Sequence, residues 1–216
     1  MNPSRMQLPK RVLVLSPHPD DGELSAGGTI AREIREKGEV YFVVFTRAEK
    51  SLPSGSKALR KKEWTEAMGQ LGVPSENTRM LDYELREFSN QRQEILEELL
   101  AMRDELHPDL VLAPSSADSH QDHQVINHEA IRAFKNTCSI WGYEHPWNNL
   151  SFSFDVLVSL TRKDVERKIA ALRCHRTQAK RMYFNEDYLF SVLRTHGVQA
   201  GLEFAEAFEL IRAIIR

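Results

Sequence analysis

Histidine and aspartate residues gather in two short segments of this chain, residues 16–23 and 118–123. The side chains able to bind a metal or move a proton there are His18, Asp20, Asp21, Asp118, His120, Asp122 and His123. Zinc accepts imidazole and carboxylate ligands, and a catalytic zinc site has three protein ligands and one open position. A segment rich in Pro, Asp and Gly is also ordinary turn chemistry, but a turn does not require a histidine beside two acids. Two such segments together predict a catalytic metal site.

Each of these segments follows a short apolar run that is typical of a buried strand. Residues 12–15 precede the first segment, and residues 109–113 precede the second. Ligands of open α/β sheets bind outside the carboxyl ends of the strands. We therefore expect the two segments to meet at one edge of a sheet, beside the first and fourth predicted strands.

The remaining pattern alternates between strands and helices. Strands are predicted over residues 40–45, 79–81 and 152–160, helices over residues 29–34, 57–71, 91–106, 123–134 and 164–174, and residues 203–215 fit either type. Residues 51–56 are the best candidate for a mobile loop. This alternation predicts an α/β fold, a Rossmann-like three-layer sandwich with a mostly parallel sheet, formed by residues 1–216 as a single domain.

Composition excludes several classes of function. The formal net charge of −2 offers no broad attraction to nucleic acid or to an anionic membrane, so neither is expected as a partner. The chain has no apolar stretch of secretion-signal or membrane-spanning length, and only two cysteines, so a cytoplasmic protein without disulfides is expected. Gly27 and Gly28 lack the G-x-G-x-x-G spacing of a dinucleotide site, which argues against a nicotinamide enzyme.

The two segments resemble the sequence motifs of the PIG-L/LmbE family of zinc-dependent N-acetyl deacetylases. The first motif matches at His18-Pro19-Asp20-Asp21-x-Glu23 and the second at His120-x-Asp122-His123, with a weaker match at Arg60-x-x-Glu63. The residues alone leave open which of Asp20 and Asp21 binds the metal and which acts as the base. The resemblance implies that the ligands of Zn²⁺, or of Fe²⁺ or another divalent metal, are His18, Asp21 and His123. It also implies that Asp20 is the general base, that His120 in a cationic form stabilises the oxyanion, and that Asp122 orients His120.

Substrate contacts are expected from Arg60, Arg86 and Trp147. Each has an ordinary alternative: Arg60 lies in a charged run that fits a solvated helix face, and Trp141, Tyr143 and Trp147 fit core packing better than a sugar platform. Ala48 stands where the family often has glycine, so the loop is expected to differ if that position needs a positive φ. The remaining histidines, predicted to be structural or exposed, are His107, His128, His145, His175 and His196.

The expected reaction is hydrolysis of an N-acetyl group on an amino sugar or related small molecule, which releases acetate and a free amine. Two alternatives remain: a metal-dependent hydrolase of another bond such as a phosphoester, and a ligand-binding relative without turnover. Two-metal phosphoesterases need further carboxylates around a second ion, and the base Asp20 is present, so the deacetylase is preferred. A homo-oligomer is possible.

Overall fold

Short strands of almost continuous apolar sequence form the centre of the molecule. The computed structural model describes residues 9–48 and 57–215. In it, β1 (Arg11–Ser16), β4 (Leu110–Pro114) and β5 (Ser139–Tyr143) bury nearly every side chain. Strands that are covered on both faces have this continuous apolar pattern, whereas half-exposed strands alternate with polar residues.

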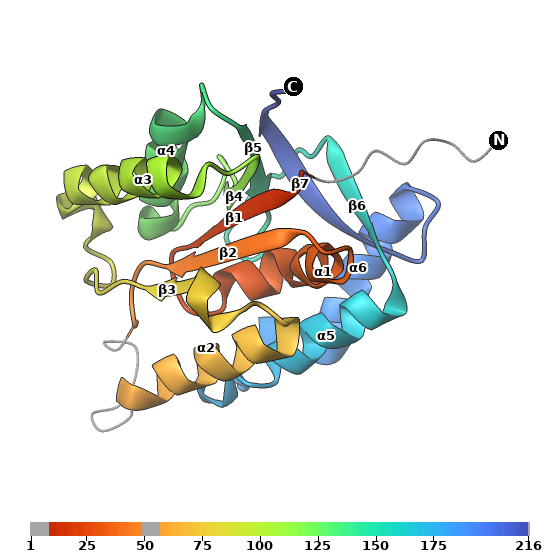
Figure 1. Ribbon diagram of the computed structural model, residues 1–216. Coiled ribbons are helices and arrows are strands. Elements are labelled where there is room, and N and C mark those ends of the chain that lie inside the picture. The colour runs from red at the N-terminus through yellow and green to blue at the C-terminus, as the bar shows by residue number, and fades with distance from the viewer. Residues whose placement is uncertain (1–8, 49–56, 216) are drawn as a thin grey trace.

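All strands of the described chain belong to one sheet with the order β3-β2-β1-β4-β5-β7-β6 (Figure 1). The other strands are β2 (Glu39–Val44), β3 (Thr78–Met80), β6 (Val156–Leu160) and β7 (Phe204–Arg212). The first five in this order run parallel, and β7 runs antiparallel to both β5 and β6. Because Val12, Leu13 and Val14 pair with Leu110, Val111 and Leu112, the carboxyl ends of β1 and β4 lie side by side.

Helices cover both faces of the sheet, which gives three layers (Figure 1). One face carries α1 (Asp21–Arg35), α2 (Lys57–Leu71), α5 (Arg162–Leu172) and α6 (Glu186–Gln199), and the other carries α3 (Arg92–Leu106) and α4 (Gln121–Phe134). Alternate residues of β1 enter different cores: Val12 and Val14 pack with the first group of helices, and Leu13 and Leu15 with the second. This period of two is the geometry of a strand between two helical layers.

The predicted α/β fold with a mostly parallel sheet is confirmed, and α2 has the predicted bounds. The helix predicted over residues 29–34 is wrong in its start, because α1 begins eight residues earlier, at Asp21. The first half of α1 contains three glycines, which favour a turn, but burial of this half against the sheet overrides that local preference. β5 and α6 were not predicted, and residues 204–212 form a strand.

Several smaller predictions bear on the chain outside the site. The candidate loop 51–56 lies outside the described residues. Ala48 is buried and has a φ of 51°, so this alanine adopts the left-handed backbone conformation that favours glycine. Cys138 and Cys174 form no disulfide among the described residues. Among the helices of residues 9–48 and 57–215, none combines the length and hydropathy needed to cross a membrane.

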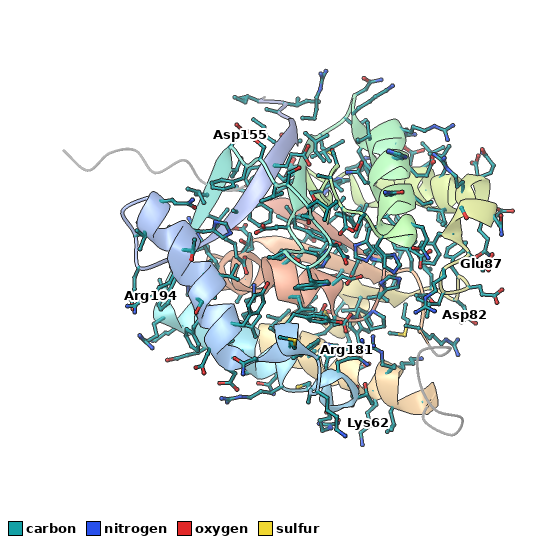
Figure 2. All side chains as sticks on the ribbon, turned by 180° about the vertical axis from the view of Figure 1, so that it is seen from behind. Lys62, Asp82, Glu87, Asp155, Arg181 and Arg194 are labelled. Carbon is teal, nitrogen blue, oxygen red and sulfur yellow. The ribbon has the colours of Figure 1, made fainter. Side chains whose placement is uncertain are left out.

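Figure 2 shows charged side chains of both signs around the outside of the molecule, among them Lys62, Asp82, Asp155 and Arg194.

Candidate metal and catalytic site

The two predicted segments meet at the carboxyl edge of β1 and β4. The loop with His18 joins β1 to α1, and His120 is the N-cap residue of α4, close after β4. Ser16 secures the first loop, because its hydroxyl donates to the carbonyl of His18 at 2.7 Å and accepts from the amide of Gly22 at 3.0 Å. Parallel pairing of β1 with β4 therefore brings residues about a hundred positions apart into one site.

Three ligand atoms form a nearly equilateral triangle at this edge. His18 Nδ1 lies 3.0 Å from Asp21 Oδ2 and 3.2 Å from His123 Nε2, and His123 Nε2 lies 3.2 Å from Asp21 Oδ2. All three side chains are buried or nearly so. Zinc–ligand distances of about 2.0 to 2.1 Å give an edge of about 3.3 Å between ligands of a tetrahedral ion. The triangle has the size and donor types of one face of such a site.

Each histidine of this triangle has its other ring nitrogen on a buried carboxylate. His18 Nε2 lies 2.9 Å from Asp122 Oδ2, and His123 Nδ1 lies 2.7 Å from Asp118 Oδ2. Such carboxylates fix the ring orientation and tautomer of metal-binding histidines. Asp122 was predicted to orient His120, but its carboxylate contacts His18 instead, and only its backbone N–H donates to His120, at 3.2 Å.

The electrostatics of the triangle favour a cation. Burial alone would raise the pKa of Asp21, but His123 and His18 hold that pKa well below its usual range. Burial alone would lower the pKa of His123, but the carboxylates of Asp21 and Asp118 raise it to about 10. Two buried carboxylates thus stabilise positive charge at this position, and imidazole and carboxylate donors are those that zinc and iron accept. The residues present fit a divalent metal.

Asp20, the residue directly before Asp21, has a strained backbone conformation. It is the N-cap residue of α1, with a φ of 139°, and its carboxylate makes no capping hydrogen bond. That carboxylate instead faces Arg60, whose Nη1 and Nη2 each lie 3.4 Å from Asp20 Oδ2. Backbone strain of this kind persists where the surrounding structure enforces it, and it is common at functional sites.

Arg60 points into the protein and is only 3% exposed, whereas its neighbours Lys61 and Lys62 are exposed. The alternative of a solvated helix residue is therefore wrong for Arg60. The partner that the structure gives it is Asp20.

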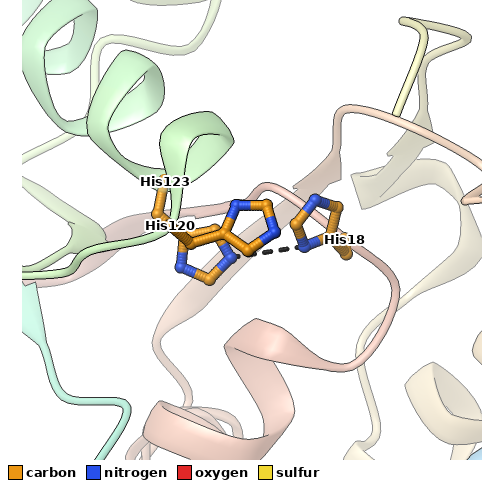
Figure 3. A group of neighbouring side chains, drawn as sticks. All are labelled: His18, His120 and His123. Carbon is orange, nitrogen blue, oxygen red and sulfur yellow. Dashed lines mark hydrogen bonds between the residues drawn. The ribbon is translucent and has the colours of Figure 1, made fainter. Parts of the chain in front are cut away.

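His120 packs beside both histidines of the triangle, at ring-centroid distances of 4.8 Å from His18 and 4.6 Å from His123 (Figure 3). Its Nδ1 accepts the backbone N–H of Asp122, so a neutral ring carries its proton on Nε2 and can donate from there. Burial, with the nearby His123 and His18, lowers the pKa of His120 to about 4. A neutral donor, rather than the expected cation, fits this environment.

His145 belongs to the same cluster, which the sequence did not indicate. It is fully buried, its Nδ1 lies 3.0 Å from Asp118 Oδ2, and its Nε2 lies 3.3 Å from the carbonyl of Asp21. Ligand atoms of Asp21, His123 and His145 lie within 4.8 Å of one another. His145 follows β5, which was not predicted, so its position at this edge had no sequence signal beyond the residue type.

The two remaining candidates for substrate contact are more exposed. Arg86 has a φ of 67° and an exposed side chain, and its backbone N–H donates to Asp122 Oδ2 at 2.8 Å. Trp147 is 39% exposed and stacks on Tyr183, with ring centroids 4.1 Å apart. Trp141 and Tyr143 are core residues, as the packing alternative predicted.

The other histidines are divided between surface and interior. His107 and His128 are exposed, as expected. His175 pairs with Glu23 at 3.0 Å and His196 with Glu144 at 3.2 Å, both in buried or nearly buried surroundings.

Comparison with known proteins identifies the family of the part of the chain that contains both motifs. The sequence profile of the PIG-L family, described as GlcNAc-PI de-N-acetylase, matches residues 13–134, the part of the chain that contains both motifs. The chain is 28% identical over 175 residues to the uncharacterized deacetylase YaiS of Escherichia coli (strain K12), covering 78% of this chain and 91% of that protein.

Two solved structures share the fold over nearly the whole chain. The conserved protein TT1542 from Thermus thermophilus has a TM-score of 0.81 and 26% identity, and 97% of each chain is covered. The N,N'-diacetylchitobiose deacetylase from Pyrococcus horikoshii has a TM-score of 0.77 and 25% identity, covering 94% of this chain and 84% of that one. With a family profile that spans more than half of its length, the chain belongs to the PIG-L family of deacetylases, hydrolases that act on amide bonds.

Proposed function

We propose that this protein is a zinc-dependent N-deacetylase that hydrolyses the N-acetyl group of an amino sugar or a related small molecule. The observation that carries the proposal is the triangle of His18, Asp21 and His123, with Asp20 as the residue directly before Asp21. The named activities of the deacetylases from E. coli and P. horikoshii support the same reaction class.

The three residues of the triangle would hold the metal. When bound, the ion would supply Lewis-acid activation of water and of the acetyl carbonyl. Asp118 and Asp122 keep the ligand rings in place through the second nitrogen of each imidazole.

Asp20 acts as the general base in this proposal. Its carboxylate accepts a proton from the water that attacks the acetyl carbonyl carbon, and it returns a proton to the leaving nitrogen as the carbon–nitrogen bond breaks. Arg60 orients this carboxylate from a buried position on α2. Acetate and a free amine are the products.

His120 stabilises the developing oxyanion by donating from Nε2, since its Nδ1 already accepts a backbone N–H. Arg86 and Trp147 are exposed and adjoin Asp122 and His145, and we propose that they contact the rest of the substrate. A sugar ring would meet the exposed part of Trp147, because Tyr183 covers one of its faces.

The first prediction concerns Asp20→Asn, which removes the base and keeps the size of the side chain. Acetate release from a panel of N-acetylglucosamine derivatives should fall by roughly 10²- to 10⁴-fold relative to the zinc-loaded parent protein. Asp155→Asn, an exposed carboxylate beside β6, is the matched control and should release acetate at the parent rate.

Three results would contradict the proposal: release that persists after chelation, an Asp20→Asn variant as active as the parent, or no release from any derivative. Phosphate release from a phosphate monoester, together with more than one metal ion per chain, would support the phosphoesterase alternative instead.

A further inference from the structure

A segment that is distant from both motifs in the sequence contacts both α1, which begins after Asp20, and α2, which carries Arg60. Residues 175–178, the 175–178 segment, follow α5 and end in a short 3₁₀ helix, Arg176–Gln178. α5 itself packs against both α1 and α2.

His175 fixes this segment to α1. The ring is 1% exposed, and its Nε2 lies 3.0 Å from Oε1 of Glu23, which is completely buried. Glu23 stands in the first turn of α1, three residues after Asp20. A buried contact in that turn restricts how the N-terminus of α1, and with it Asp20, can move.

Thr177 fixes the same segment to α2. Its backbone N–H donates to Glu63 Oε1 at 2.9 Å, and its hydroxyl donates to Glu63 Oε2 at 2.6 Å, so both oxygens of the buried carboxylate are engaged. Glu63 stands three residues after Arg60, and residues at this spacing lie on the same side of a helix. The two hydrogen bonds therefore restrict the position of Arg60.

The contact between Arg60 and Asp20 depends on how α1 and α2 are placed relative to each other. Both nitrogen–oxygen distances are 3.4 Å, at the long end for a hydrogen bond, so a small displacement would break them. A buried ion pair is favourable only in good geometry. We propose that His175 and Thr177 are positioning residues of the hydrolytic site, which keep Arg60 against Asp20 by holding Glu23 and Glu63. This inference rests on the proposed role of Asp20 as the base.

The second prediction is made for Thr177→Val, which keeps the size and the backbone N–H but removes the hydroxyl donor. The kcat for acetate release should fall by about 10-fold, while KM and zinc content stay within about twofold of the parent, because the orientation of the base changes and the ligands do not. Thr177→Ser restores the hydroxyl and should recover most of the kcat. His175→Gln should lower kcat in the same way.

Matched controls separate this role from general packing. Thr29→Val changes a buried threonine whose hydroxyl has no partner among the described residues, and His196→Gln changes another histidine paired with a glutamate. Both should keep the parent kcat. In an Arg60→Met background, Thr177→Val should have almost no further effect on kcat, since its influence passes through Arg60.

The outcomes distinguish this inference from the proposed function. A Thr177→Val variant that is folded, zinc-loaded and as active as an active parent would overturn the positioning role and leave the deacetylase intact. If the parent itself releases no acetate, the proposed function fails, and the nitrogen NMR shift of the Arg60 Nη groups, which face Asp20, then tests the contact directly. That shift should change in Thr177→Val and return in Thr177→Ser, and an unchanged shift would overturn the inference.

Discussion

At the scale of single residues, the proposed metal site is supported by buried carboxylates that contact its histidines. Asp118 accepts from the Nδ1 atoms of both His123 and His145, at 2.7 and 3.0 Å. Asp118→Asn removes the charge that stabilises these rings and leaves one oxygen acceptor for three donors, because Asp118 Oδ1 also accepts the backbone N–H of His120 at 2.9 Å. We expect zinc affinity to fall by roughly 10- to 100-fold. Competition with a chromogenic zinc chelator measures this, with Asp155→Asn as the control, and an unchanged affinity would show that Asp118 does not support the ligand.

At the scale of elements, α1 reaches the sheet closely enough to place Asp21 only because its second residue is glycine. A Cβ on Gly22 would lie 2.5 Å from Phe42 Cζ and 3.1 Å from Val14 Cγ1, both buried strand residues. Gly22→Ala should therefore lower the free energy of unfolding by about 1 to 3 kcal/mol, measured by urea denaturation. It should also reduce bound zinc per chain, because Asp21 is the adjacent residue.

Gly69→Ala is the control for this substitution. Gly69 lies in α2, and apart from its chain neighbours and the backbone of its own helix, no atom of the described residues lies within 4 Å of an added Cβ, so alanine should stabilise the helix by up to about 1 kcal/mol. Equal stability of Gly22→Ala and the parent would show that α1 can shift without cost.

At the scale of the whole molecule, Glu33 links stability to pH. Burial, with the nearby Glu36, raises its pKa to about 7, and its Oε1 has no partner among the described residues. Below about pH 4.5 this carboxyl is protonated in both the folded and the unfolded chain. Between that pH and about 7 the unfolded chain releases the proton first, so stability falls as pH rises through this window.

Glu33→Gln removes this loss. The variant should therefore gain stability relative to the parent as pH rises. Its free energy of unfolding minus that of the parent should be about 1 to 3 kcal/mol larger at pH 8 than at pH 5. Urea denaturation at the two pH values measures the change, and the pH-independent effects of the amide cancel in it. A difference that stays constant with pH would show that Glu33 ionises in the folded protein as it does in the unfolded chain.

Local patterns in the sequence were sufficient for much of the fold. Continuous apolar runs identified β1, β2 and β4 to within about one residue, and α2 has the predicted bounds. These elements carry their periodicity within a few residues. β5 contains Gly142 between aromatic residues and was missed, because its strand conformation depends on pairing with β4 and β7.

The two motifs and the strands before them determined that residues 16–23 and 118–123 would meet, since parallel strands bring their carboxyl ends to one edge. Only the tertiary structure decided the contacts around them: Asp122 on His18, Asp118 shared with His145, Arg60 on Asp20, and the 175–178 segment across α1 and α2. Each of these contacts joins side chains from different elements, and its partner is set by helix packing and loop geometry. Spacing along the chain therefore predicts which segments meet at a sheet edge, but it does not predict which side chains from different elements contact each other.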